Sequence, residues 1–214
     1  MRKKSHVSLA NHIIGECAAE NRILHTGAFK LGSLAPDLVP SFITKKHQIG
    51  ETFDILEKKT YKILDTYDRG KGLNKRRTKD MGVITHYIAD YFTFPHNEQY
   101  EGSLKDHMHY EKELITALNN YVSSIDVDAP DKVMDVVFLE NCSSAEDIFR
   151  YIRQSHNIYI CMRQQRISSG QICSISTLVE SDCEYIIRIC RNVINAIMKL
   201  LECKPAYGTV CLSM

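Results

Sequence analysis

The sequence predicts an all-α protein, and three features of it support that prediction. Apolar residues recur at intervals of three and four along most of the chain, which is the spacing of one face of an α-helix. No segment alternates apolar and polar residues in the manner of a half-buried strand. Glycine, proline and serine stand where several of the periodic segments begin or end.

The apolar periodicity divides the chain into a series of helices. The expected helices span, in chain order, residues 5–20, 21–33, 51–68, 80–94 and 104–123, a shorter segment near Pro130, residues 144–166, and a long last segment through Leu201. Gly32 and Pro36 are expected to stop the second helix. Residues 38–50 are expected to form a loop, and residues 69–79 a basic connection. Thr177 and Glu180 match the capping box of the last helix.

Two signals define the connection between the central helices. Pro95 is expected to end the helix of residues 80–94 near Phe94, which leaves His96 on a loop. Ser103 then matches the N-cap of the next helix, with Asp106 at the capping-box position.

Length and composition indicate one globular domain, residues 1–214. Apolar residues make up 44% of the chain and charged residues 25%, which are ordinary globular values. The net charge of +1 gives no overall attraction for nucleic acid or an anionic membrane. Polar residues interrupt the apolar part of the amino-terminal segment, and no run approaches the ~20 apolar residues that span a bilayer. We therefore expect a cytoplasmic protein without a transmembrane segment.

The chain has eight cysteines but no CxxC pair. Several of them stand at core-like helical positions, where cysteine behaves as a small apolar residue. Together with the expected compartment, this favours reduced thiols over a disulfide framework.

Residues 86–111 concentrate the residue types that bind metal ions, including four of the nine histidines. His86 and Asp90 stand four apart, so they share one face of a helix, and His107 and Glu111 repeat the spacing. Imidazole and carboxylate at this spacing suit zinc or a similar divalent ion. His109 and Glu113 have the same spacing, and positions two apart point in opposite directions. Only one of the two pairs can therefore face a shared site.

Each candidate also has an ordinary structural interpretation. The pair of His86 and Asp90 could be an exposed ion pair, but its helix is apolar on several sides, and a buried pair needs partners such as a metal ion. Taken singly, His6 and His47 fit solvated histidines near turns. We interpret three further histidines as surface or core residues without a metal role: His12, His25 and His156.

Four segments together resemble a known family. THYIADYFTFPH followed by KDHMHYE matches the HYxxDxxxxxH and HxxxE pattern of the bacterial zinc-dependent phospholipase C family, whose fold is shared with fungal single-strand nucleases. LGSLAPD resembles the LGSxxPD segment of the family, and SHVSLA the stretch that carries its first histidine. The resemblance covers residues 5–111, and the last hundred residues match only in being helical. It implies one domain with a metal-site part (residues 1–124) and a helical completion (residues 125–214).

The resemblance also implies which residues bind metal. One ion would be held by Asp37, His47, His86 and Asp90, and a second by His96, His107 and Glu111. Asp90 would bridge to a third ion, held also by His6. Asp37 would be the catalytic carboxylate that orients or deprotonates the attacking water.

Two departures from the family pattern limit what carries over. In secreted members, the amine and carbonyl of an amino-terminal Trp complete the third site, and this chain has no Trp. Met1 is only five residues before His6, so we expect its amine not to reach the ions. Two zinc ions are therefore expected, with the third site weak or absent. Leu38 replaces an aromatic residue of the choline pocket, so phosphocholine specificity does not carry over.

The resemblance implies a metal-dependent phosphoester hydrolase that uses a metal-bound hydroxide on a phosphodiester or phospholipid head group. The partner would be a phosphate-ester substrate, and no stable nucleic-acid complex is expected. One alternative is a nuclease or phosphomonoesterase on the same fold, for which three aromatic residues could stack bases: Tyr87, Tyr91 and Phe94. The other is a metal-binding module without catalysis. Lys45, Lys46 and the basic segment 71–79 are open to two interpretations, as phosphate-attracting or simply solvated residues.

Overall fold

The computed structural model describes residues 1–18, 23–39, 46–121, 130–170 and 174–203. Within these ranges the chain forms α-helices and short 3-10 turns, without a β-strand, so the prediction of an all-α fold is confirmed. The helices are α1 (Lys3–Ala18), α2 (Thr26–Leu34), α3 (Ile49–Asp65), α4 (Lys75–Tyr91), α5 (Leu104–Asn120), α6 (Pro130–Asn141), α7 (Ala145–Ser168) and α8 (Ile175–Glu202). Two 3-10 turns matter for the site, η1 (Ala35–Leu38) and η3 (Phe94–His96).

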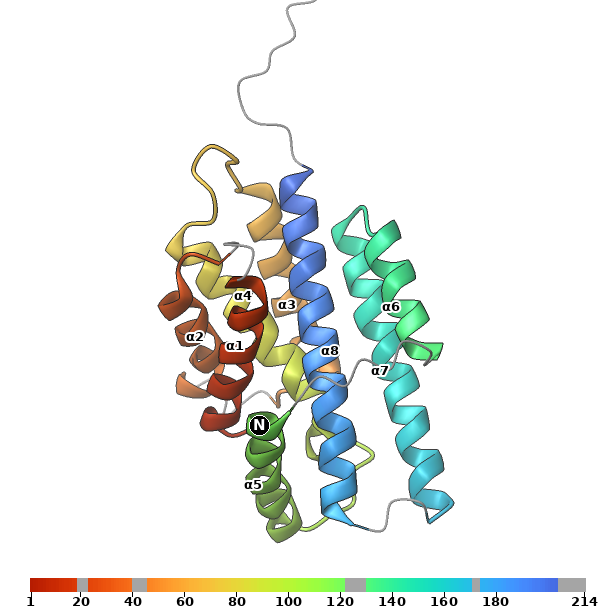
Figure 1. Cartoon of the computed structure of the whole chain (residues 1–214). Coiled ribbons are helices and arrows are strands. Elements are labelled where there is room, and N and C mark those ends of the chain that lie inside the picture. Colours follow the sequence, from red (N-terminus) through yellow and green to blue (C-terminus); the bar gives the residue numbers. More distant parts are fainter. Residues whose placement is uncertain (19–22, 40–45, 122–129, 171–173, 204–214) are drawn as a thin grey trace, which may run out of the picture.

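Helix α4 is the central element. Every side chain from Asp80 to Tyr91 is buried, because α1, α2, α3 and α8 all pack against it. In Figure 1, α1 and α2 lie on one side of the long helix α8, and α6 and α7 lie on the other. Water does not reach a helix that is covered on all sides, so any polar side chain on it needs a hydrogen-bond or charge partner from within the protein. This requirement applies to two residues of α4 in particular, His86 and Asp90.

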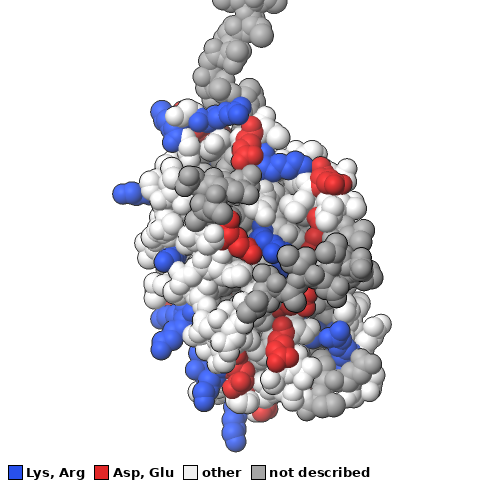
Figure 2. Space-filling model, viewed as in Figure 1, with Lys and Arg blue, Asp and Glu red and all other residues white. Residues whose placement is uncertain are grey.

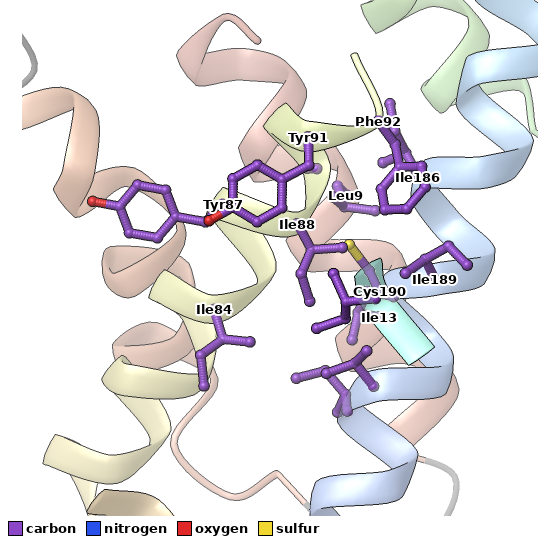
Figure 3. Close-up of a cluster of buried hydrophobic side chains, with 14 of the residues drawn as sticks. Leu9, Ile13, Ile84, Tyr87, Ile88, Tyr91, Phe92, Ile186, Ile189 and Cys190 are labelled. Carbon is purple, nitrogen blue, oxygen red and sulfur yellow. The ribbon is translucent and has the colours of Figure 1, made fainter. Parts of the chain in front are cut away.

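The hydrophobic core joins the amino-terminal and carboxyl-terminal halves of the chain. Figure 3 shows part of it, where apolar side chains of α1, α4 and α8 come together. Ile13, Ile88 and Cys190, one from each helix, are completely buried there. Burial of such side chains removes apolar surface from water, which is the main favourable term in folding.

Two glycines allow α2 and α4 to cross at close range. A Cβ atom on Gly32 would lie 2.0 Å from the Lys79 carbonyl oxygen, and one on Gly82 would lie 2.1 Å from the Phe29 carbonyl oxygen. Any larger residue would force the helices apart. The expected end of the second helix near residue 33, before Pro36, is confirmed within one residue, because α2 ends at Leu34. The role expected for Gly32 is wrong, since the helix continues past it and uses it for packing.

Several helix boundaries differ from the sequence-based expectation. Helix α4 begins at Lys75, capped by the Asn74 side chain, so part of the expected connection 69–79 is helical. It ends at Tyr91, before the expected stop near Phe94. The last helix begins at Ile175, because Ser174 and not Thr177 accepts the capping hydrogen bond.

Other boundaries agree more closely. The capping box of Ser103 and Asp106 at the start of α5 is confirmed. The helix expected over 21–33 begins at Thr26, and residues 19–22 lie outside the described ranges, as do residues 122–123 of the helix expected over 104–123.

The described residues show a surface of mixed charge, free cysteines and no helix that could cross a membrane. Acidic and basic side chains are interspersed on the face in Figure 2. The five cysteines whose state the structure gives are free: Cys142, Cys161, Cys183, Cys190 and Cys203. None of the helices described is both long and apolar enough to cross a bilayer.

Candidate metal centre

The eight ligand candidates come from six separate elements of the chain. His6 lies on α1, Asp37 on η1, His47 just before α3, His86 and Asp90 on α4, His96 on η3, and His107 and Glu111 on α5. The structure brings all eight side chains into three groups, each with ligand atoms within 4.8 Å of one another. The groups are His6 with Asp37 and His86, His47 with His86 and Asp90, and His96 with His107 and Glu111. We call the first five residues the buried group (His6, Asp37, His47, His86, Asp90) and the last three the open group (His96, His107, Glu111).

Asp90 lies at the centre of the site, and its two carboxylate oxygens face different partners. Oδ2 is 2.9 Å from Nδ1 of His47 and 3.2 Å from Nε2 of His86. Oδ1 is 3.5 Å from Nε2 of His6 and 3.6 Å from Nδ1 of His96. Asp90 is the residue that connects the buried group to the open group.

The orientation of His86 is set by the crossing of α2 and α4. Its Nδ1 lies 2.8 Å from the Ser33 carbonyl oxygen, which accepts a hydrogen bond from the ring. The proton therefore sits on Nδ1, and the lone pair of Nε2 faces Asp90 and His47. A backbone carbonyl in this position is how metal-binding histidines are commonly held in one tautomer.

His6 stacks on His86, with ring centroids 3.8 Å apart. Its side chain is completely buried, and neither ring nitrogen has a hydrogen-bond partner in the structure. A buried imidazole without a hydrogen-bond partner costs folding free energy. Nε2 of His6 points toward Asp90 and Asp37, where a bound ligand would pair with it. A divalent cation bound there would satisfy it. The donor set of imidazoles and carboxylates fits zinc.

The open group is more exposed and spans two elements. Nε2 of His107 lies 3.3 Å from Oε1 of Glu111, and Nε2 of His96 lies 3.7 Å from the same oxygen. His109, the competing histidine of α5, is exposed. Of the two pairs on this helix, the one that faces the other ligand candidates is thus His107 with Glu111.

The amine of Met1 also lies in the site, which corrects the expectation that it does not reach. Its nitrogen is 2.6 Å from Oδ1 of Asp90, 2.9 Å from Nε2 of His96 and 3.7 Å from Oε1 of Glu111. The reason is that α1 begins at Lys3 and passes close to α4 and α5, so a short segment before His6 is enough. The separation of five positions between Met1 and His6 therefore gave a wrong expectation of how close the amine comes to the other ligand candidates.

Electrostatics favour the protonation states that a metal ion requires. Burial, helped by His86, lowers the pKa of His6 to about 3. Burial alone would raise the pKa of Asp90, but the Met1 ammonium and the surrounding histidines hold it well below its usual range. The pKa of Glu111 is lowered as well, because hydrogen bonds from His107 and His96 outweigh burial. At neutral pH the site therefore offers a neutral imidazole and ionised carboxylates.

An open cleft of about 690 Å³ adjoins the site. Three ligand candidates line it, one from the buried group and two from the open group: His47, His96 and His107. Lys46, Glu98 and Tyr100 complete part of its wall. A ligand in this cleft would contact the accessible side of the site.

The remaining candidates lie elsewhere. His156 is buried and bonded to Asn97, and His12 pairs with Glu16, so both have structural partners. His25 is the N-cap residue of α2. In the basic segment, Arg77 is buried and pairs with Asp80.

Sequence reasoning missed three participants in this region. They are the Met1 amine, the Ser33 carbonyl and the buried carboxylate of Asp182, which bonds to the segments of the open group. Only Ser33 had a sequence signal, as part of the segment LGSLAPD.

The fold and the site thus define an all-helical protein with clustered histidines and carboxylates that could hold metal ions. A family model described as zinc dependent phospholipase C matches residues 5–163, and the chain belongs to this family. The match extends beyond the resemblance at residues 5–111 to include α6 and most of α7. Searches of curated proteins and of solved structures found no match.

Proposed function

We propose that this protein is a metal-dependent phosphodiester hydrolase whose catalytic centre is formed by the buried group and the open group together. The observation that carries the proposal is the position of Asp90 between the two groups, beside an open cleft. Membership of the zinc-dependent phospholipase C family supports the reaction class.

In the proposed centre Asp37, His47, His86 and Asp90 would hold one zinc ion. His96, His107 and Glu111 would hold a second. Oδ2 of Asp90 faces His86, and Oδ1 faces His96 and His6. Bound divalent ions would lower the pKa of a water molecule and offset the negative charge that develops on the phosphoryl group.

His86 and Asp37 have different roles in the proposed reaction. His86, fixed by the Ser33 carbonyl, keeps its Nε2 lone pair directed at the ion. Asp37 is partly exposed, and its Oδ1 lies 3.7 Å from Nδ1 of His47 and 3.7 Å from Nε2 of His86. A carboxylate this loosely held can orient the attacking water or take its proton, which is the catalytic role we assign to it.

The Met1 amine supports a third ion site, with His6 and Oδ1 of Asp90 as the other ligands. A deprotonated amine is a nitrogen donor like imidazole, and its nitrogen already lies 2.6 Å from Asp90. In the absence of an ion the ammonium form offsets the charge of the carboxylate. Absence of Trp therefore does not by itself remove the third site.

The substrate we propose is a phosphate ester, with phospholipid included. The cleft has polar and charged walls, with the exposed Lys46, Glu51 and Glu98 among them, so an anionic phosphoryl group would be attracted by bound metal ions and Lys46. The nuclease alternative is less well supported, because the three aromatic residues considered for base stacking are all buried: Tyr87, Tyr91 and Phe94.

One experiment separates the candidates. Protein purified without chelator would be analysed for metal content and assayed on a chromogenic phosphodiester, a phosphomonoester, single-stranded DNA and phospholipid vesicles. We expect two or three zinc ions and cleavage of the phosphodiester and the phospholipid. Bound metal without turnover would instead identify a non-catalytic module, and preferential cleavage of DNA would identify a nuclease. Protein that binds no divalent ion would refute the proposal.

A further inference from the structure

Asp182 is a completely buried carboxylate on α8 that takes no part in the ligand groups. It lies outside residues 5–163, the part of the chain that the family model matches. Its charge is offset by the Arg163 guanidinium of α7, with which it forms an ion pair. A buried ion pair adds little net stability compared with an apolar replacement, so its position in the structure points to another role.

The hydrogen bonds of Asp182 join the two segments that carry the open group. Its Oδ2 accepts a hydrogen bond of 3.2 Å from the Phe94 backbone N–H, at the start of η3. The same oxygen accepts one of 2.5 Å from the Tyr110 hydroxyl of α5. His96 follows Phe94 by two residues, and Tyr110 is next to Glu111. One carboxylate oxygen therefore holds both sides of the open group.

The open group needs such support because its own connection is weak. Residues 98–99 and 101–103, between η3 and α5, are exposed, so this loop does not fix the distance between His96 and Glu111. A second contact acts on η3 alone, where Asn97 bonds to the Tyr91 and Thr93 carbonyl oxygens and to His156. The Met1 amine and the Tyr100 ring also contact both η3 and α5. The bonds of Asp182 differ from these because a completely buried side chain of another helix makes them to both segments.

We propose that Asp182 is a positioning residue that sets the geometry of the open group for metal binding. The inference rests on the proposed function in one respect, that the open group binds a metal ion. Burial raises the pKa of Asp182, and the Arg163 guanidinium opposes this rise. The hydrogen bond from Tyr110 ties the carboxylate to α5. Helix α8 thereby contributes to a site that contains none of its own side chains.

The test is a metal titration of the full chain, first stripped with chelator, with Co²⁺ as the probe. Tyr110→Phe removes only the hydroxyl that donates to Asp182. The matched control is Tyr151→Phe, because Tyr151 is also buried and donates to a buried carboxylate, Asp135, at 2.7 Å. Neither Tyr151 nor Asp135 belongs to η3 or α5. Circular dichroism would verify that each variant is folded.

We expect Tyr110→Phe and Asp182→Asn to weaken one Co²⁺ binding step by about tenfold or more, as loss of a supporting hydrogen bond does at other metal sites. The visible Co²⁺ spectrum of that step should change as well. The weakened Co²⁺ binding step should be the step that His107→Ala abolishes. Adding Tyr110→Phe to the His107→Ala variant should therefore cause no further loss of Co²⁺ affinity. Tyr151→Phe should lower the melting temperature and leave both steps unchanged.

Unchanged Co²⁺ affinity and spectrum in Tyr110→Phe would overturn the inference, even if Asp182→Asn failed to fold. An equal loss of affinity in Tyr151→Phe would also overturn it, because the effect would then be general destabilisation. Both results leave the proposed function intact, since the parent still binds metal. A parent chain that binds no Co²⁺ would refute the proposed function and this inference together.

Discussion

The buried group and the open group use the same residue types but are built in different ways. Helix α4 supplies His86 and Asp90 to the buried group, and α1 and η1 lie directly against α4. The open group is divided between a 3-10 turn and the first half of α5, and its histidines are 16% and 29% exposed. His6, His86 and Asp90 of the buried group are thus held by the packed helices α1 and α4, whereas the open group depends on contacts from residues outside it.

This difference predicts different behaviour on perturbation. Changes in the buried group should affect stability and metal content together, because His6, His86 and Asp90 lie in the core and the His6 ring nitrogens lack hydrogen-bond partners. Changes around the open group should affect metal affinity more than folding. The following experiments test this distinction in order of expected effect.

The largest effect is expected for Asp90→Asn. The substitution keeps the shape but removes the charge that faces Met1, His6, His47, His86 and His96. At least one metal ion should be lost, and hydrolysis of a chromogenic phosphodiester should fall to the level of the chelated parent, while the helical circular dichroism persists. His109→Ala is the control and should retain both properties. Parent-like activity in Asp90→Asn would contradict the bridging role.

Removal of metal should lower the melting temperature. An ion bound only by the folded protein, at one hundred times its Kd, stabilises it by about 2.7 kcal/mol. For a chain of this size that corresponds to a decrease of about 5–10 °C on chelation. Scanning calorimetry before and after chelator, and after added zinc, would measure it. An unchanged melting temperature with metal loss verified would argue against a stabilising role for the ions.

An added residue at the amino terminus should act on both groups at once. A glycine placed before Met1 replaces the ammonium beside Asp90 with a peptide N–H and removes a partner from a buried charge, which costs about 3 kcal/mol. The metal-free protein should melt at a lower temperature, and the weakest ion should be lost from the metal-loaded protein. A glycine added after Met214 serves as the control. Identical melting and metal content in the two extended chains would show that the amine is dispensable.

The effect most restricted in its conditions concerns His156, which supports η3 of the open group through Asn97 and acts only at acidic pH. Burial lowers the pKa of His156 to about 4, below the value of about 6.5 in an unfolded chain. Between pH 4 and 6.5 the unfolded state binds more protons at His156 than the folded state does. The contribution of His156 to the free energy of unfolding is therefore fully present above pH 6.5 and is lost as the pH falls toward 4. The loss is at most about 3 kcal/mol.

Denaturant unfolding of the chelated protein at several pH values would measure this loss. His156→Gln keeps a donor for Asn97 but does not titrate, so its stability should depend less on pH than that of the parent. His109→Gln, at an exposed position, should behave as the parent does. An equal pH dependence in His156→Gln and the parent would exclude His156 as the source.

The sequence by itself determined the helical fold class, most helix boundaries, and the residue types gathered near α4. These are local properties, because helical periodicity, capping and the spacing of His86 and Asp90 depend on residues only a few positions apart. Only the tertiary structure decided that Gly32 packs rather than ends a helix, that the Met1 amine reaches Asp90, and that Asp182 bonds both to η3 and to α5. These contacts join residues from about 50 to about 90 positions apart. Their existence depends on how helices cross in space, which no local pattern of the sequence specifies.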